Sequence, residues 1–150
     1  MDDKILEFLI VAKQKTYAGK GNEVSSSRLK SHDLKYIDGN MMYYDSYLGN
    51  DLFSGEEALW IDNNPYWSMN YIGRVKGDNF SGDFLKEALL LVNKEYPYRG
   101  PLYYKNGDYE YKMNVEGSFE WFIGHEIILY KDKEIYECNF HGGILKERKL

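Results

Sequence analysis

A chain of 150 residues fits one domain, and at this size a hydrophobic core can bury enough surface to fold without a structural metal or disulfide. The formal net charge of -5 disfavours contact with nucleic-acid phosphates, and no apolar run approaches the roughly 18 residues of a membrane span. With a single cysteine and an acidic amino-terminal stretch in place of a signal peptide, the composition predicts one cytoplasmic domain, residues 1–150, that binds neither nucleic acid nor membrane.

The first half predicts one helix followed by four strands. Residues 3 to 16 place apolar side chains three and four positions apart, which is typical of an amphipathic helix. The pair Asp38-Gly39, between runs rich in Tyr and Ile, predicts a β-hairpin. A second hairpin is expected around "DNNP", where the missing N–H of Pro65 favours a four-residue loop over 62 to 65.

The second half predicts the same order of elements. Residues 81 to 93 again have helical spacing, and Ser81 is placed to cap the helix. The pair Asn106-Gly107 predicts a hairpin, and "YKDKEI" predicts the last one.

Segments 53 to 73 and 122 to 142 align without a gap. The identical residues of the first segment, Phe53, Gly55, Glu57, Asn70 and Gly73, match Phe122, Gly124, Glu126, Asn139 and Gly142. The predicted fold is therefore α+β, a duplicated unit of one helix and four antiparallel strands with the helices packed on the antiparallel sheet. The repeats would be residues 1–75 and 76–150. Chance likeness between two aromatic-rich strand segments is the alternative.

Alternation along the strands separates an apolar face from a mixed one. The apolar face, which predicts the core, holds Ala58, Trp60, Trp67, Met69 and Tyr71, with the counterparts Ile127, Leu129, Tyr136, Cys138 and Phe140. On this assignment Cys138 is a small buried hydrophobe and not a nucleophile.

The mixed face predicts a candidate site. A symmetric loop sets Glu57 opposite Asn70, and the matching turn sets Glu126 opposite Asn139. Either the pairs form ordinary cross-strand hydrogen bonds on a wet face, or they line a groove that holds a small molecule, cationic or aromatic, or a protein segment. In a shared groove, burial should raise the pKa of both acids. The candidate ligand-binding residues are Glu57, Asn70, Tyr66, Glu126, Asn139, His141 and Tyr130.

Other motifs are weaker. The segment "SSSRLKSHD" contains Ser, His and Asp but is expected to be a polar loop, because neighbours in sequence rarely form a catalytic triad. The histidines lack metal-ligand spacing. Arg99 in "YPYRGP" is expected to form a surface salt bridge, and pairing with another carboxylate or an anion is the alternative. No catalytic residue, cofactor or metal is predicted.

Three classes of function stay open. The first is a non-enzymatic binding or sensor module that uses the mixed faces. The second is a small hydrolase-like enzyme, which would bring a His within reach of Glu57 or Glu126 in a deep pocket. The third is a structural dimerisation module with an exposed apolar patch and no cavity.

Several motifs carry a resemblance to a known family: "SSSRLKSHDLKY", "YYDSYLG", "FSGEEALW", "WSMNYIG", "YRGP" and "NFHGG". Read together, they resemble a family of small bacterial domains of unknown function, found alone or behind a helix-turn-helix of the XRE regulator type. The resemblance spans roughly Leu6 to Ile144 and implies no assigned chemistry. The chain itself runs from its first helix directly into a Gly-rich linker and strands.

Overall fold

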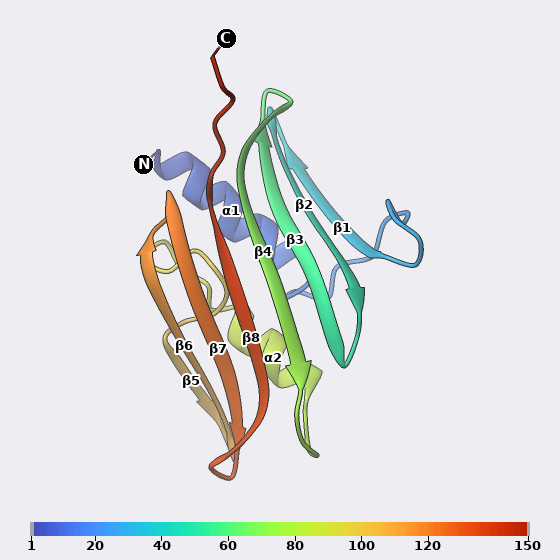
Figure 1. Ribbon diagram of the computed structural model, residues 1–150, viewed down its shortest axis with the longest axis vertical. Helices are drawn as coiled ribbons and strands as arrows, with labels where there is room; N and C mark the ends of the chain where they lie inside the picture. Colours follow the sequence, from blue (N-terminus) through green and yellow to red (C-terminus); the bar gives the residue numbers. More distant parts are fainter. Residues whose placement is uncertain (1, 150) are drawn as a thin grey trace.

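The computed structural model describes residues 2–149, and its dominant element is one eight-stranded antiparallel sheet (Figure 1). The strands are β1 (His32–Asp38), β2 (Met41–Gly49), β3 (Leu52–Ile61), β4 (Asn64–Val75), β5 (Tyr103–Asn106), β6 (Tyr109–Ser118), β7 (Trp121–Tyr130) and β8 (Lys133–Ile144). The helices are α1 (Asp3–Lys15) and α2 (Gly82–Leu89). In space the strands follow the order β1-β2-β3-β4-β8-β7-β6-β5, so two four-strand meanders meet where β4 pairs with β8.

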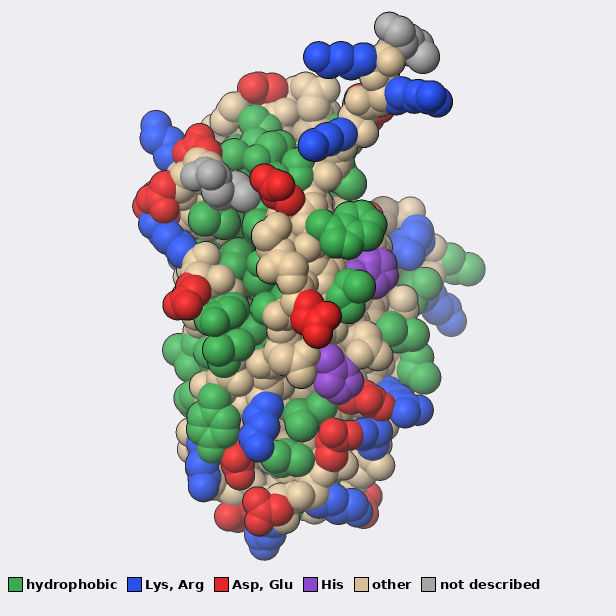
Figure 2. Space-filling model, turned by 60° about the vertical axis from the view of Figure 1, so that its left-hand side comes forward, with side chains coloured by type: hydrophobic (Ala, Val, Ile, Leu, Met, Phe, Trp, Pro, Cys, Tyr) green, Lys and Arg blue, Asp and Glu red, His purple; other side chains and the backbone are tan. Residues whose placement is uncertain are grey.

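Both helices lie on one face of the sheet (Figure 1), α1 against β1 and β2 and α2 against β6. The core lies between these two layers and is rich in aromatic rings. The described helices leave the opposite face uncovered, and Figure 2 shows apolar side chains exposed among polar ones. Trp121 and Ile123 of β7 are among the exposed apolar residues on this face. We call this the outer face. Neither described helix has the length and apolar character needed to cross a membrane.

The helices begin at capping residues. The Asp2 carboxylate accepts a hydrogen bond from the Lys4 N–H at 2.9 Å and starts α1. Ser81 caps α2 by accepting from the Phe84 N–H at 3.1 Å, as predicted. α2 ends at Leu89, before the predicted residue 93, where the chain tightens into i to i−3 hydrogen bonds.

The predicted duplicated α+β unit is wrong, because the fold is largely β. The helices have 13 and 8 residues, against eight strands joined in a single sheet. The pairing of β4 with β8 makes that sheet continuous, so the two halves are not separate helix-plus-four-strand units.

The predicted register of the long hairpins is also wrong, by one residue. β3 and β4 are joined by a two-residue turn at Asp62 and Asn63, both with positive φ, and a β-bulge lies between Leu59 and Trp60. Pro65 lies in β4 opposite Trp60, beside the bulge, where a proline is tolerated in a sheet. The hairpin of β7 and β8 has the same kind of turn and a bulge at the matching place.

A one-residue shift exchanges the two faces of a strand. In β4 and β8 the predicted core residues are in the core. In β3 and β7 the faces are exchanged, so that Ala58, Trp60, Ile127 and Leu129 lie on the outer face. The core face of these strands therefore receives Leu59 and Ile128, and with them Glu57 and Glu126.

Candidate functional site

Five acidic and basic side chains, two of them Lys or Arg and three Asp or Glu, are buried on the core face of the sheet, and we call them the buried charge cluster. They are Lys13 of α1, Asp45 of β2, Glu57 of β3, Arg99 of the segment before β5, and Glu126 of β7. Charges are costly to bury unless they are paired and hydrogen-bonded, so the partners of each group determine what the cluster can do.

Glu57 and Lys13 form the first ion pair. The Lys13 Nζ lies 2.6 Å from the Glu57 Oε1 and also donates to the Tyr98 carbonyl at 2.8 Å. The Tyr43 hydroxyl donates a short hydrogen bond to the same Oε1. Burial lowers the pKa of Lys13, and the charge of Glu57 opposes that shift.

Arg99 and Glu126 form the second ion pair, a bidentate one. The Arg99 Nε and Nη2 lie 2.9 and 2.8 Å from the two Glu126 carboxylate oxygens. The Tyr111 and Tyr136 hydroxyls donate to these oxygens at 2.7 and 2.8 Å. Burial opposes ionisation of Glu126, but Arg99 and the hydrogen bonds hold its pKa below the ordinary value. The raised pKa expected for an acid in a shared groove is therefore not found for Glu126, because its ion pair and hydrogen bonds outweigh the effect of burial.

Asp45 is the third carboxylate and has no cation of its own. Its Oδ1 accepts a hydrogen bond from the Tyr71 hydroxyl at 2.5 Å, and the Arg99 guanidinium lies 5.3 Å from the centre of the Tyr71 ring. Among residues 2–149, no Lys, Arg or His forms an ion pair with Asp45. Burial, followed by the charge of Glu57, raises the pKa of Asp45 to about 7, although Tyr71, Arg99 and Lys13 act in the other direction.

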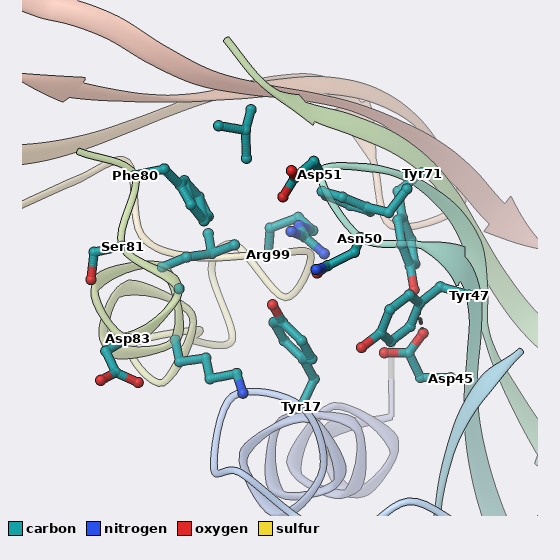
Figure 3. A pocket seen from close by; sticks show the side chains of 15 residues that line it. Tyr17, Asp45, Tyr47, Asn50, Asp51, Tyr71, Phe80, Ser81, Asp83 and Arg99 are labelled. Carbon is teal, nitrogen blue, oxygen red and sulfur yellow. Dashed lines mark hydrogen bonds between the residues drawn. The ribbon is translucent and has the colours of Figure 1, made fainter. Parts of the chain in front are cut away.

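A cavity of about 470 Å³ opens beside Asp45, between the segment that follows α1, α2 and the strands (Figure 3). Figure 3 shows the Tyr17 side chain pointing toward Arg99, with Asn50 and Asp51 of the β2–β3 turn at one side and Ser81 at the start of α2 on the other. Its aromatic lining residues are Tyr17, Tyr47, Phe53, Tyr71 and Phe80. A side cavity of about 30 Å³ shares Tyr17, Asp45 and Arg99 with it and extends to Lys13 and Glu57.

The structure separates the predicted site residues between the two faces of the sheet. Glu57 and Glu126 lie in the buried charge cluster, whereas Asn70, Asn139 and His141 lie on the outer face. Tyr66 and Tyr130 are half-buried and pack against the core.

The two predicted carboxylate–amide pairs are wrong. Glu57 is opposite Met69 and Glu126 is opposite Cys138, because of the register shift. Asn139 instead contacts His125 at 2.6 Å, and Asn70 lines an outer-face groove that also contains Trp60. Of the predicted site residues, only Glu57 lines the side cavity, and none lines the larger cavity.

Sequence reasoning missed Lys13, Asp45 and Arg99. Asp45 lies two positions from both Tyr43 and Tyr47 in β2, so the three side chains share one face of the strand. Assigning the tyrosines to the core would therefore have placed Asp45 there too. Lys13 follows Leu9 by four positions on the apolar side of α1. Arg99 was expected at the surface, and no local pattern in "YPYRGP" reveals that it reaches a buried carboxylate.

The remaining motifs do not join the cavity. Asp33 is buried on the outer face and accepts hydrogen bonds from Ser27, Tyr44 and Ser46, while His32 pairs with Glu23 at 2.8 Å. The Ser, His and Asp of this segment therefore form no triad. Cys138 is buried as predicted, and burial raises the pKa of its thiol to about 12.

Asp45 gives the cluster a testable effect on stability. Because its pKa is raised, the folded state binds the Asp45 proton more tightly than the unfolded chain, so this group stabilises the fold at low pH and loses that contribution as pH rises from about 4 to about 7. Asp45→Asn, which can still accept from Tyr71, should raise the free energy of unfolding at pH 8 by up to about 4 kcal/mol.

Urea unfolding at pH 5 and pH 8, followed by tryptophan fluorescence, measures this difference. The matched control is Glu56→Gln, which removes one negative charge from an exposed position on the outer face of β3 and should change stability by less than about 0.5 kcal/mol at either pH. An Asp45→Asn variant less stable than the wild type at pH 8 would contradict the assignment.

Comparison with known proteins identifies a family and no activity. The family model for a domain of unknown function, DUF5680, matches residues 45–145. Neither the comparison with curated proteins nor that with solved structures finds a match. The matched segment contains Asp45, Arg99 and Glu126 and all eight strands except β1 and the start of β2. The chain belongs to the DUF5680 family of domains of unknown function.

Proposed function

We propose that the domain is a non-enzymatic binding module whose cavity takes a small molecule that is both cationic and aromatic. The observation that supports this most is the position of Asp45, a buried carboxylate without a cation, on the wall of a cavity with five aromatic side chains. A cationic group beside Asp45 would gain from its charge and from the faces of Tyr47 and Tyr71. The volume of about 470 Å³ is within the range of small-molecule sites.

The competing classes have less support. The enzyme hypothesis needs a His within reach of a carboxylate in a pocket, but no His is among the described residues that line the cavity. His32 and His125 approach Glu23 and Glu137 away from it. A structural module without a cavity does not explain why Asp45 lines a hollow of this size.

The regulatory role is part of the proposal. The resemblance to domains that follow XRE-type helix-turn-helix segments favours a sensor, in which ligand binding changes a contact with another protein segment. The cytoplasmic location stays a prediction from the sequence, consistent with a metabolite-like ligand.

Binding can be tested with benzyltrimethylammonium, a permanent cation with one aromatic ring. It should raise the melting temperature of the wild type at pH 7.5, and Asp45→Asn should weaken its affinity by at least about 10-fold because the counter-ion is lost. Isothermal titration measures the affinity of both proteins. Glu56→Gln, on the outer face, should bind as the wild type does.

Two results would overturn the proposal. One is a wild type that binds neither this cation nor any member of a panel of aromatic amines. The other is an Asp45→Asn variant, folded by circular dichroism, with unchanged affinity.

A further inference from the structure

We propose that the cavity exchanges one proton for one positive charge: the ligand's cationic group replaces the proton of Asp45. This inference rests on the proposed function and adds how the site is regulated. It starts from the charge balance of the buried charge cluster, in which two cations, Lys13 and Arg99, meet three carboxylates, Asp45, Glu57 and Glu126.

Both cations, Lys13 and Arg99, already form ion pairs with other carboxylates. Lys13 lies 2.6 Å from Glu57, and Arg99 is bidentate to Glu126, so each pair is neutral. When Asp45 ionises, the cluster carries one uncompensated negative charge. An unpaired charge away from water is strongly unfavourable, so either a proton or a cation must accompany it.

The surroundings of Asp45 offer it only partial compensation. The titratable groups around it are Tyr43 and Tyr47 of its own strand, Glu57 of β3, Tyr71 of β4, Lys13 of α1, Tyr17 after α1 and Arg99 before β5. The cavity beside it is also lined by Asp51 of the β2–β3 turn and by Asp83 and Lys86 of α2. The tyrosines are protonated at neutral pH, because the ordinary tyrosine pKa of 10.0 is already high and burial raises the pKa of each further. Among the charged neighbours, Glu57 has the largest effect and raises the pKa of Asp45. Arg99 and Lys13 lower it.

The open side of Asp45 is the cavity. The Tyr71 hydroxyl occupies one carboxylate oxygen, and no described residue donates a hydrogen bond to the other, Oδ2. A ligand ammonium group entering the cavity can therefore approach Oδ2 while its organic part contacts the aromatic walls. The pKa of about 7 supports the exchange, because both forms of Asp45 are then populated near neutral pH.

The exchange predicts how the affinity for a cation depends on pH. A permanent cation is the suitable probe, because its own charge does not change with pH. Affinity for benzyltrimethylammonium should rise about tenfold per pH unit below pH 7 and level off above it, which amounts to about 25-fold between pH 5.5 and pH 7.5. At pH 6.5 binding should release about 0.8 proton, the fraction of Asp45 that is protonated there. Benzyl alcohol, which is neutral, should release none.

Isothermal titration at pH 6.5 in phosphate and in ACES buffer, neither of which contains an aromatic cation, counts the protons, because the observed heat differs between buffers in proportion to the protons released. Asp45→Asn should release none. If that variant does not fold, carbon-13 NMR of the wild-type Asp45 carboxyl, with and without the probe, gives the same answer, since the probe should move its titration to lower pH.

The outcomes separate this inference from the proposed function. Binding with no proton release and no change of affinity with pH would overturn the exchange and leave the binding function standing. No binding at any pH from 5.5 to 8.5 would overturn both. Proton release on adding potassium chloride alone would support the exchange and identify an inorganic monocation as the occupant, against the organic ligand.

Discussion

Arg99→Met is expected to lower the free energy of unfolding by about 3 to 5 kcal/mol at pH 7. The substitution keeps much of the apolar volume but leaves the Glu126 carboxylate, which is 0% exposed, without its cation. Hydrogen bonds from Tyr111 and Tyr136 remain, yet two neutral hydroxyls do not replace a guanidinium. Urea unfolding of both proteins at pH 7 measures the loss.

The pH dependence and a double variant identify the cause. In the wild type the lowered pKa of Glu126 means that this group stabilises the fold above its ordinary pKa and loses that contribution on acidification. In Arg99→Met the sign reverses, so the variant should recover stability as the pH falls from 7 to 5. Adding Glu126→Gln should restore most of the loss at pH 7, because no buried charge is then left unpaired. A loss below about 1 kcal/mol, or a double variant no better than the single one, would contradict a buried ion pair at this position.

Trp67→Ala is expected to cost about 3 to 5 kcal/mol, and Trp60→Ala less than about 1.5 kcal/mol. Trp67 is 0% exposed, with its ring stacked at 5.3 Å on Phe119 and at 6.0 Å on Phe122. Its Nε1 has no hydrogen-bond partner, so truncation leaves no polar group newly unpaired and the cost is one of packing. Trp60 is half-buried on the outer face.

The two variants form a matched pair, one indole from each face of the same hairpin. Guanidinium unfolding gives the stabilities, and near-ultraviolet circular dichroism reports whether the aromatic core stays ordered. Equal losses in the two variants would mean that Trp60 is in the core after all, as the sequence predicted.

The main difference between the predicted and the observed structure is a shift of one residue in the strand pairing of the long hairpins. The helices and hairpins were predictable because caps, helical spacing and Gly-containing turns are local signals, as Ser81 and Gly39 illustrate. The bulge at Leu59 and Trp60 has no such signal, since it depends on the pairing of β3 with β4. Pro65 pointed to a longer loop because its place beside that bulge could not be foreseen.

The candidate site depended on the same register. The sequence singled out Glu57 and Glu126, and the structure places both together with Lys13 and Arg99 in the core. Their cations come from 44 and 27 positions away in the chain, so no local pattern links them. The cavity beside Asp45 was beyond prediction for a further reason, because its lining comes from segments far apart in the chain: Tyr17 after α1, strands β2 to β4, α2 and Arg99.

The place of β8 in the sheet has a consequence for how this chain is made. β8 is the last described strand but lies between β4 and β7, so its residues pair with residues synthesised 61 to 77 positions earlier, from Val75 with Tyr136 to Trp67 with Ile144. Until β8 leaves the ribosome, the first meander has an unpaired edge at β4, a template for wrong association. Closing the sheet across such a separation is a slow, non-local step. A nascent chain stopped before Lys133 should therefore depend on chaperones, although seven of its eight strands are already present.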